Sequence, residues 1–267
     1  MKNKKQVLAI IAIAFLVALY AVPLVLSITM PDSGWFNASI ASVILIPILL
    51  FAFLLVLKAV KPSKSPIIDT IVLDSGNVLV DFAWKEHMEE LGFNEKAIDY
   101  LTKNMIRHPL WNEFDRGIRP FYDIVDEFCR NNPDYEKEIR QFFEHPGDMI
   151  TARPYVIPWI QNLKKAGYKV YVLSNWSDPC YEELKDSILS FEQYLDGAIW
   201  SYQHQCIKPE PEIYEKLIKT YHIDPARAVF LDDTQKNLDG AKPFGFHTIL
   251  VTDHESALEG LRALGVK

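Results

Sequence analysis

The hydrophobic pattern of the chain changes character after about residue 64. Residues 7–26 and 38–57 are two runs of twenty uncharged, mostly apolar residues. At a rise of about 1.5 Å per residue, each run as a helix is about 30 Å long, the thickness of a bilayer core. Residues 30–37 between them contain Pro, Gly and Asn, which favour a turn, and Trp35 and Phe36, which suit a membrane interface. We therefore predict a two-helix transmembrane hairpin.

Two other interpretations of these runs stay open. The first run follows Lys2, Lys4 and Lys5, as the apolar region of a cleaved signal peptide would. Both runs are also apolar enough for buried core helices. The first run is long for a signal peptide, and a second run follows it directly. Adjacent charge-free runs of this length are rare in soluble domains, so the hairpin is favoured.

Lysines flank the outer ends of the two runs. Three precede the first run, and Lys58, Lys61 and Lys64 follow the second, whereas the stretch between the runs contains no Lys or Arg. The positive-inside rule then places both ends, and the domain that follows, in the cytoplasm. Neither run contains an ionisable residue, so the hairpin is expected to be an anchor. Residues 61–66 are a Pro- and Ser-containing linker, and we place the domain boundary between residues 64 and 65.

From residue 65 to 267, short apolar runs alternate with stretches of helical spacing. Strands are expected at 67–73, 168–173, 198–200, 228–231 and 247–251, and helices at 154–166 and 209–220. Such alternation predicts an α/β fold with a parallel sheet covered on both faces. Residues 84–152 interrupt it with helical spacing alone, which indicates an inserted helical cap.

The charge of this second part argues against nucleic-acid binding. Residues 1–64 hold six lysines and one acid, Asp32, so residues 65–267 carry 22 basic and 34 acidic residues, a net charge near −12. A nucleic-acid-binding domain is expected to have a basic face. The three cysteines, Cys129, Cys180 and Cys206, match no metal-site spacing and are expected to be reduced thiols.

Polar residues stand directly after three of the predicted strands. Asp74, Ser174 and the pair Asp232-Asp233 occupy these places, and Lys208 precedes a predicted helix. In an open parallel sheet, ligands bind beyond the carboxyl ends of the strands, so these side chains are expected to meet. A single acid after a strand is commonly only a turn former or helix cap, but four such features in this order favour a functional site.

These segments resemble the four motifs of the haloacid dehalogenase-like superfamily. The similar stretches are Ile71-Val72-Leu73-Asp74-Ser75-Gly76-Asn77-Val78, Val172-Leu173-Ser174-Asn175, Lys208-Pro209-Glu210-Pro211, and Phe230-Leu231-Asp232-Asp233-Thr234 continuing to Gly240-Ala241. The resemblance covers about residues 67–253. It implies a Rossmann-like core with a small helical cap inserted after the first motif.

The resemblance also implies residue roles that agree with the chemistry of phosphate transfer. Asp74 would be the nucleophile that forms an aspartyl-phosphate, and Ser174, Asn175 and Lys208 would hold the phosphate. A carboxylate repels a phosphate, so a cation is needed between them. Mg²⁺ favours carboxylates and other oxygens, and Asp74, Asp232, Asp233 and the backbone carbonyl of Gly76 would supply them. Backbone N–H groups of residues 75–77 are further expected phosphate donors.

One position departs from the usual pattern of these phosphatases. They carry a second Asp two residues after the nucleophile as general acid and base, and this chain has Gly76 there. A branch that resembles bacterial sugar-phosphate phosphatases shares the Asp-x-Gly-Asn form, and residues 111–117 of the predicted cap also resemble that branch. Trp111 and Phe114 are therefore either substrate contacts or simply cap core.

The sequence thus favours a membrane-anchored, Mg²⁺-dependent phosphatase of a small phosphorylated metabolite, with a sugar phosphate among the candidates. Two alternatives stay open. A haloacid dehalogenase uses the same Asp nucleophile without metal, although Asp232 and Asp233 make more sense beside a cation. A non-catalytic domain that binds a phosphorylated ligand or partner at the membrane is the other, and Gly76 is the feature in its favour. Whether the chain dimerises through its hairpin is also left open.

Overall fold

The computed structural model describes residues 67–267, together with the isolated residues 21, 25, 28, 29 and 51. The predicted hairpin therefore lies almost wholly outside the described residues. Among the residues that are described, no helix has both the length and the apolar character needed to cross a membrane. By its internal contacts the chain divides into two units, Met1–Lys64 and Ser65–Lys267.

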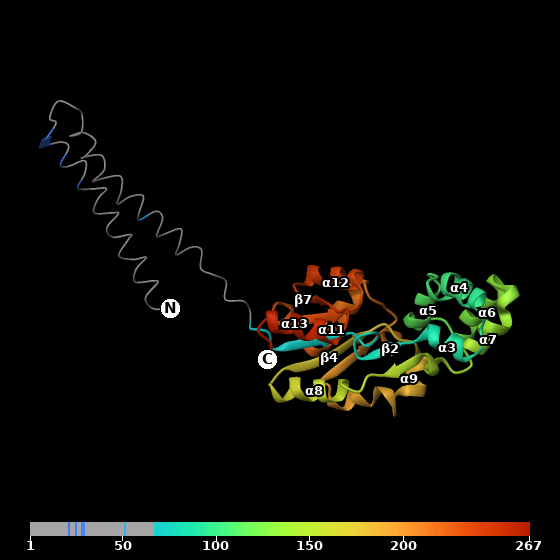
Figure 1. The fold of residues 1–267 in the computed structure, drawn as a ribbon. Coiled ribbons are helices and arrows are strands. Elements are labelled where there is room, and N and C mark those ends of the chain that lie inside the picture. The colour runs from blue at the N-terminus through green and yellow to red at the C-terminus, as the bar shows by residue number, and fades with distance from the viewer. Residues whose placement is uncertain (1–20, 22–24, 26–27, 30–50, 52–66) are drawn as a thin grey trace. The chain divides into compact units, whose positions relative to one another are not determined.

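The centre of the second unit is a five-stranded parallel sheet with the order β5-β4-β1-β6-β7 (Figure 1). Its strands are β1 (Thr70–Leu73), β4 (Lys169–Ser174), β5 (Gly197–Trp200), β6 (Ala228–Asp232) and β7 (His247–Leu250). All five strands predicted from the sequence are present, and the predicted α/β fold with a parallel sheet is confirmed. Leu73 pairs with Val172 on one side and Leu231 on the other, so Asp74, Ser174 and Asp232 lie at one edge of the sheet.

Successive side chains of a strand point to opposite faces, and helices cover each face. Ile71 and Leu73 belong to the apolar cluster on the side of α8 (Val156–Lys165) and α13 (His254–Ala263). Val72 belongs to the second cluster, with α11 (Pro211–Tyr221) and α12 (Gln235–Ala241). The central strand β1 is buried on both faces, which explains its uninterrupted apolar sequence.

The two helices expected at 154–166 and 209–220 are α8 and α11, each shorter at its N-terminal end than predicted. Helix α11 begins at Pro211, and Glu210 before it has extended backbone, as the residue before a proline usually does. Three core helices were not predicted individually, α9 (Asp178–Leu184), α12 and α13. The remaining short elements of the core are α10 (Ser201–His204), η5 (Ile188–Tyr194), η6 (Pro225–Arg227) and η7 (Lys242–Phe244).

The predicted helical cap is present between β1 and α8 (Figure 1). It contains α3 (Trp84–Glu90), α4 (Glu95–Leu101), η2 (Thr102–Ile106), α5 (Trp111–Arg116), α6 (Phe121–Asn131), η3 (Pro133–Tyr135), α7 (Glu136–Phe142) and η4 (Pro146–Met149). Its interior is aromatic. The rings of Phe114, Phe121, Phe128 and Phe143 contact one another with centroids 4.7–6.4 Å apart.

The two connections to the cap form a small antiparallel sheet that the sequence did not predict. Strands β2 (Val80–Phe82) and β3 (Ile150–Ala152) pair with each other, so the helical part of the cap ends before the predicted residue 152. Arg153 ties these connections together. Its guanidinium donates to Asp81 Oδ1 at 2.5 and 2.8 Å and to the Asn77 carbonyl at 2.8 Å. The base of the cap is therefore linked to the turn that carries Asp74.

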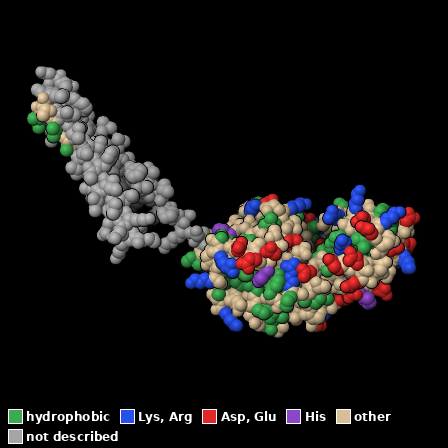
Figure 2. Space-filling model, viewed as in Figure 1, with side chains coloured by type: hydrophobic (Ala, Val, Ile, Leu, Met, Phe, Trp, Pro, Cys, Tyr) green, Lys and Arg blue, Asp and Glu red, His purple; other side chains and the backbone are tan. Residues whose placement is uncertain are grey.

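Acidic and basic side chains are intermixed on the face of this unit that Figure 2 shows. The three cysteines are buried and unpaired as free thiols, in line with their predicted reduced state.

Close packing around Gly240 gives a stability prediction. A Cβ atom there would lie 2.9 Å from both the Pro209 carbonyl oxygen and the Tyr214 hydroxyl, and a backbone atom cannot yield cheaply. We expect Gly240→Ala to lower the free energy of unfolding by about 1–3 kcal/mol, the usual effect of overpacking. Urea unfolding measures this change. Gly76→Ala is the control, because a Cβ at Gly76 has nothing within 4 Å, and an equal loss in both variants would contradict the packing argument.

Candidate functional site

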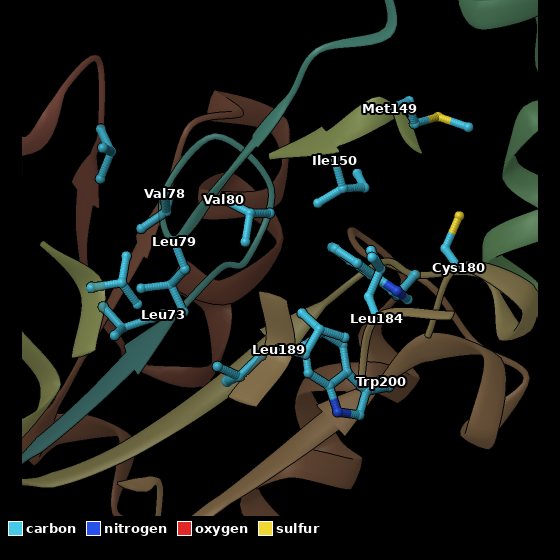
Figure 3. Close-up of a cluster of buried hydrophobic side chains, with 14 of the residues drawn as sticks. Leu73, Val78, Leu79, Val80, Met149, Ile150, Cys180, Leu184, Leu189 and Trp200 are labelled. Atoms are coloured by element: carbon cyan, nitrogen blue, oxygen red, sulfur yellow. The ribbon is translucent and has the colours of Figure 1, made fainter. Parts of the chain in front are cut away.

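The turn after β1 is held in place by the apolar residues on both sides of it. Val78, Leu79 and Val80 are almost fully buried and belong to the same apolar cluster as Leu73 (Figure 3). The Ser75 carbonyl accepts hydrogen bonds from the N–H groups of all three. The turn is therefore short and fixed, and it places Asp74 at the end of a fully buried strand.

One residue of this turn has a backbone conformation that usually favours glycine. The residue with left-handed backbone is Asn77, at φ 55°, and not Gly76. Asn uses this conformation more readily than most residues. Gly76 lines the cavity described below, and a side chain there would meet open space within it. The Ser75 N–H, one of the expected phosphate donors, is instead bonded to Asp74 Oδ1 at 2.7 Å.

Three donor groups surround one oxygen of Asp74, Oδ1. Besides the Ser75 N–H, Ser174 Oγ donates to Asp74 Oδ1 at 2.9 Å and Lys208 Nζ lies 2.7 Å from it. No hydrogen bond within the described residues uses Oδ2. Within the described residues, the carboxylate is thus held through Oδ1.

Lys208 is the buried cation of the site. Its side chain is 1% exposed, and Nζ also lies 2.7 Å from Asp232 Oδ2. Asn175 fixes its backbone, since Asn175 Oδ1 accepts from the Lys208 N–H at 2.7 Å and Asn175 Nδ2 donates to the Lys208 carbonyl at 3.1 Å. Asn175 was expected to hold substrate. It does line the cavity, but both ends of its amide already have protein partners.

The acidic pair after β6 has two different environments. Asp232 is fully buried and accepts from the Thr234 N–H at 2.8 Å and from Asn237 Nδ2 at 3.1 Å. Asp233 is half-buried, lines the cavity and accepts from Asn77 Nδ2 at 2.9 Å. Carboxylate oxygens of Asp74, Asp232 and Asp233 all lie within 4.8 Å of one another.

This cluster has more negative than positive charge. Burial raises the pKa of Asp74 to about 7, Lys208 opposes that rise, and the carboxylates of Asp232 and Asp233 add to it. Burial alone would lower the pKa of Lys208, but Asp232 and Asp74 raise it above its ordinary value. Three carboxylates around one ammonium group form a donor set that fits a small divalent cation, since such an ion favours oxygen ligands and offsets the excess charge.

A cavity of about 250 Å³ opens between this cluster and the cap. Its polar floor includes Asp74, Gly76, Ser174, Asn175, Lys208 and Asp233. The wall from the cap and its connections is largely apolar and comprises Phe82, Trp111, Phe114, Phe121, Phe143, Pro146, Met149 and Ile150. Trp111 and Phe114 both pack in the apolar cluster around the cap interior, and both also line the cavity.

The cap is attached to the core beside this cavity by two polar contacts from α5. Arg116 makes a bidentate ion pair with Glu210 at 2.6 and 2.7 Å. Ser201 Oγ donates to the carbonyl of Asp115 at 2.5 Å. At Gly117, where φ is 68°, a Cβ would lie 2.8 Å from the Tyr202 backbone, so the cap and core approach closely there. Asp115 also lines the cavity, and sequence reasoning did not identify it as a site residue.

Residues 68–245 match the family model described as a haloacid dehalogenase-like hydrolase. The chain is 39% identical over 186 residues to bifunctional epoxide hydrolase 2 of Rattus norvegicus, a match that covers 64% of this chain and 31% of that protein. It is 35% identical over 97 residues to D-ribitol-5-phosphate phosphatase of Bacteroides thetaiotaomicron, covering 34% and 47%. It is 31% identical over 189 residues to (S)-2-haloacid dehalogenase 4A of Burkholderia cepacia, covering 67% and 81%. The chain thus spans less than half the length of the first two relatives.

A solved structure shares the fold. The enzyme bt-2542 of the same Bacteroides thetaiotaomicron, crystallised with magnesium and inorganic phosphate, superposes with a TM-score of 0.55 at 20% identity. The superposition covers 70% of this chain and 96% of that one.

The charge balance of the site gives a second prediction. Lys208→Met keeps the apolar stem of the side chain but leaves the buried carboxylates without their ammonium partner. We expect the free energy of unfolding in chelator to fall by about 3 kcal/mol, as when one partner of a buried ion pair is removed. Denaturant unfolding measures this loss, and added Mg²⁺ should recover part of it.

Two further variants serve as controls. Lys219→Met removes an exposed lysine of a surface ion pair and should cost at most about 0.5 kcal/mol. Adding Asp232→Asn to Lys208→Met should reduce the loss, because one of the uncompensated charges is then gone. Equal stability of Lys208→Met and Lys219→Met would show that the buried carboxylates are not stabilised by the Lys208 ammonium group.

Proposed function

Because the chain belongs to the haloacid dehalogenase-like hydrolase family, we propose that it is a phosphatase that cleaves small phosphomonoesters through an aspartyl-phosphate on Asp74. The observation that carries this proposal is the three-point fixation of Asp74 Oδ1, which leaves Oδ2 for attack beside a buried lysine. The similarity to a curated D-ribitol-5-phosphate phosphatase supports the same activity.

In the proposed reaction, Asp74 Oδ2 attacks phosphorus while Ser174 and Lys208 keep the carboxylate in position. Lys208 also places a positive charge beside the phosphate, and Asn175 maintains Lys208 through its backbone. Water then hydrolyses the aspartyl-phosphate and regenerates Asp74. Mg²⁺ held by Asp74, Asp233 and the Gly76 carbonyl, with Asp232 behind them, would neutralise charge between phosphate and carboxylate. Magnesium in the related bt-2542 structure supports this choice of ion.

The lining of the cavity bears on the organic part of the substrate. The cap wall is largely aromatic and aliphatic, which favours a phosphate ester of a small alcohol with an apolar carbon skeleton. A sugar or polyol phosphate is the second candidate, and the ribitol-phosphate phosphatase relative favours it. The volume of about 250 Å³ suits a compact substrate in either case.

The lining also weighs against the dehalogenase alternative, although one relative is a haloacid dehalogenase. A haloacid needs a cation for its carboxylate in addition to the nucleophile. Within the described part of the chain, the cavity lining includes Lys208 and no arginine or histidine, and Lys208 is already shared by two carboxylates. A metal-dependent reaction of a phosphate makes better use of this arrangement.

Substitution of Asp74 tests the proposed function. Asp74→Asn keeps size and polarity, but an amide is a poor nucleophile. Turnover of the full-length protein should fall at least about a thousandfold, or roughly 4 kcal/mol of transition-state stabilisation. A panel of alkyl, prenyl, sugar and polyol phosphates with Mg²⁺ measures the rates and shows which class is preferred.

Asp186→Asn, an exposed carboxylate on the same domain, is the matched control and should be as active as the parent. Beryllium fluoride, a phosphate mimic, should raise the melting temperature of the parent and not of Asp74→Asn. A folded Asp74→Asn protein with normal turnover would overturn the assignment of the nucleophile. Activity that persists unchanged in chelator would overturn the role of the metal.

We also propose that residues 1–64 anchor the enzyme in a membrane, with the hydrolase domain in the cytoplasm. The two apolar runs and their flanking lysines carry this proposal. A cysteine introduced at Ser33 should react with an impermeant thiol reagent in intact cells, and one introduced at Lys267 should not. The native cysteines are buried, which keeps the background low. The reverse labelling pattern would contradict this topology.

A further inference from the structure

Asp115 is a carboxylate in the cavity that the reaction described above does not use. It lies near the end of α5, keeps part of its surface accessible, and lines the cavity from the cap. Among the hydrogen bonds and ion pairs of the described residues, none involves its carboxylate oxygens, whereas the neighbouring acid Glu113 pairs with Arg116. An acid without a partner that lines a cavity beside a proposed nucleophile is a candidate for a chemical role.

The backbone around Asp115 is fixed on both sides. Its own carbonyl accepts from Ser201 Oγ, and the next residue, Arg116, makes the bidentate pair with Glu210. Glu210 follows Lys208 by two residues, so one short segment of the core holds both the buried cation and the anchor of α5. The carboxylate is therefore presented to the site by a rigid attachment and not by a free loop.

The proposed reaction lacks a group for proton transfer. When the ester bond breaks, an alkoxide leaves and must be protonated, and the water that attacks the aspartyl-phosphate must lose a proton. Gly76 occupies the place where related phosphatases carry an acid for this purpose, and it has no side chain. A Cβ there would meet only open space, so the cavity has room for the missing group to come from elsewhere.

The other titratable groups of the lining are already committed. Lys208 is shared by Asp74 and Asp232, and Asp233 belongs to the carboxylate cluster. Cys180 donates to the Pro146 carbonyl, and burial raises the pKa of its thiol to about 12. Within the described lining, Asp115 is the acid left over.

The environment of Asp115 suits a group that both gives and takes a proton near neutral pH. Burial raises its pKa to about 7, with Lys208 opposing the rise and the charge of Asp74 adding to it. General acids and bases act best when their pKa lies near the working pH.

We propose that Asp115, supplied by the cap, is the general acid and base of this enzyme in place of the residue that Gly76 replaces; this inference rests on the proposed phosphatase function. In the first step Asp74 Oδ2 bonds to phosphorus, the bond from phosphorus to the ester oxygen breaks, and that oxygen takes the proton of Asp115. In the second step the Asp115 carboxylate removes a proton from water, the water oxygen bonds to phosphorus, and the bond to Asp74 breaks. Phosphate leaves, and both aspartates return to their starting forms.

A different role for Asp115 would be a hydrogen bond to a substrate hydroxyl. That role predicts a change of KM that depends on the substrate's hydroxyl groups, with kcat little affected. Proton transfer instead predicts an effect on kcat that depends on the basicity of the leaving oxygen. The two roles are therefore separable by kinetics.

The test uses Asp115→Asn in the full-length protein, with an alkyl phosphate and p-nitrophenyl phosphate as substrates. For the alkyl ester, kcat should fall about a hundredfold or more, the usual contribution of a general acid. Nitrophenolate leaves without protonation, so p-nitrophenyl phosphate should give a burst of one nitrophenolate per enzyme, followed by slow turnover as the aspartyl-phosphate accumulates. Asp99→Asn, an exposed acid on α4 of the same cap, should show neither effect.

A second experiment restores an acid at position 76 and tests for recovered activity. Gly76→Asp in the Asp115→Asn background should recover a large part of the alkyl phosphate turnover and remove the burst. Unchanged kcat and no burst in Asp115→Asn, or a rise of KM alone, would overturn the proposal. These outcomes are distinct from failure of the proposed function, in which the parent protein cleaves no phosphomonoester or Asp74→Asn remains active.

Discussion

The contact of Lys208 with two buried carboxylates is the interaction on which the rest of the site depends. Asp74 and Asp232 lie at the ends of adjacent strands, and their two carboxylates would repel each other without a cation between them. Lys208 reaches between them from a third segment, and Asn175 from a fourth fixes its backbone. Pairing of the strands brings the two carboxylates together, and Lys208 offsets part of their repulsion.

The remaining negative charge defines what the site can bind. One lysine cannot balance Asp74, Asp232 and Asp233 together. Burial is the main reason for the raised pKa of Asp74, and the charges of Asp232 and Asp233 add to it. A divalent cation would offset the remaining negative charge and offer coordination positions to the oxygens of a phosphate group. The same segment that supplies Lys208 also supplies Glu210, which anchors the cap through Arg116. One short segment therefore both attaches the cap to the core and supplies the positive charge of the site.

Much of the core could be predicted from local pattern. A strand such as β1 that is buried on both faces must be apolar throughout, so its sequence and its end are visible without any partner. The polar residues at strand ends were identifiable for the same reason, and the structure brings Asp74, Ser174, Lys208, Asp232 and Asp233 together as expected. Strands β2 and β3 were missed because three residues are too few to establish a period, and their pairing joins positions 70 residues apart.

The sequence by itself determined the α/β class, the position of the cap and the acidic residues that meet at the sheet edge, since each of these depends on patterns within a few neighbouring residues. It also predicts the membrane hairpin, which lies outside the described residues. Only the tertiary structure decided that Asn175 supports Lys208, that Asn77 and not Gly76 takes the left-handed conformation, and that Asp115 lines the cavity. These features depend on contacts between distant segments, and a side chain's partner across such a distance leaves no periodic signal in the chain. The cap brings its acid to the site through the Arg116–Glu210 pair, whose residues are 94 positions apart.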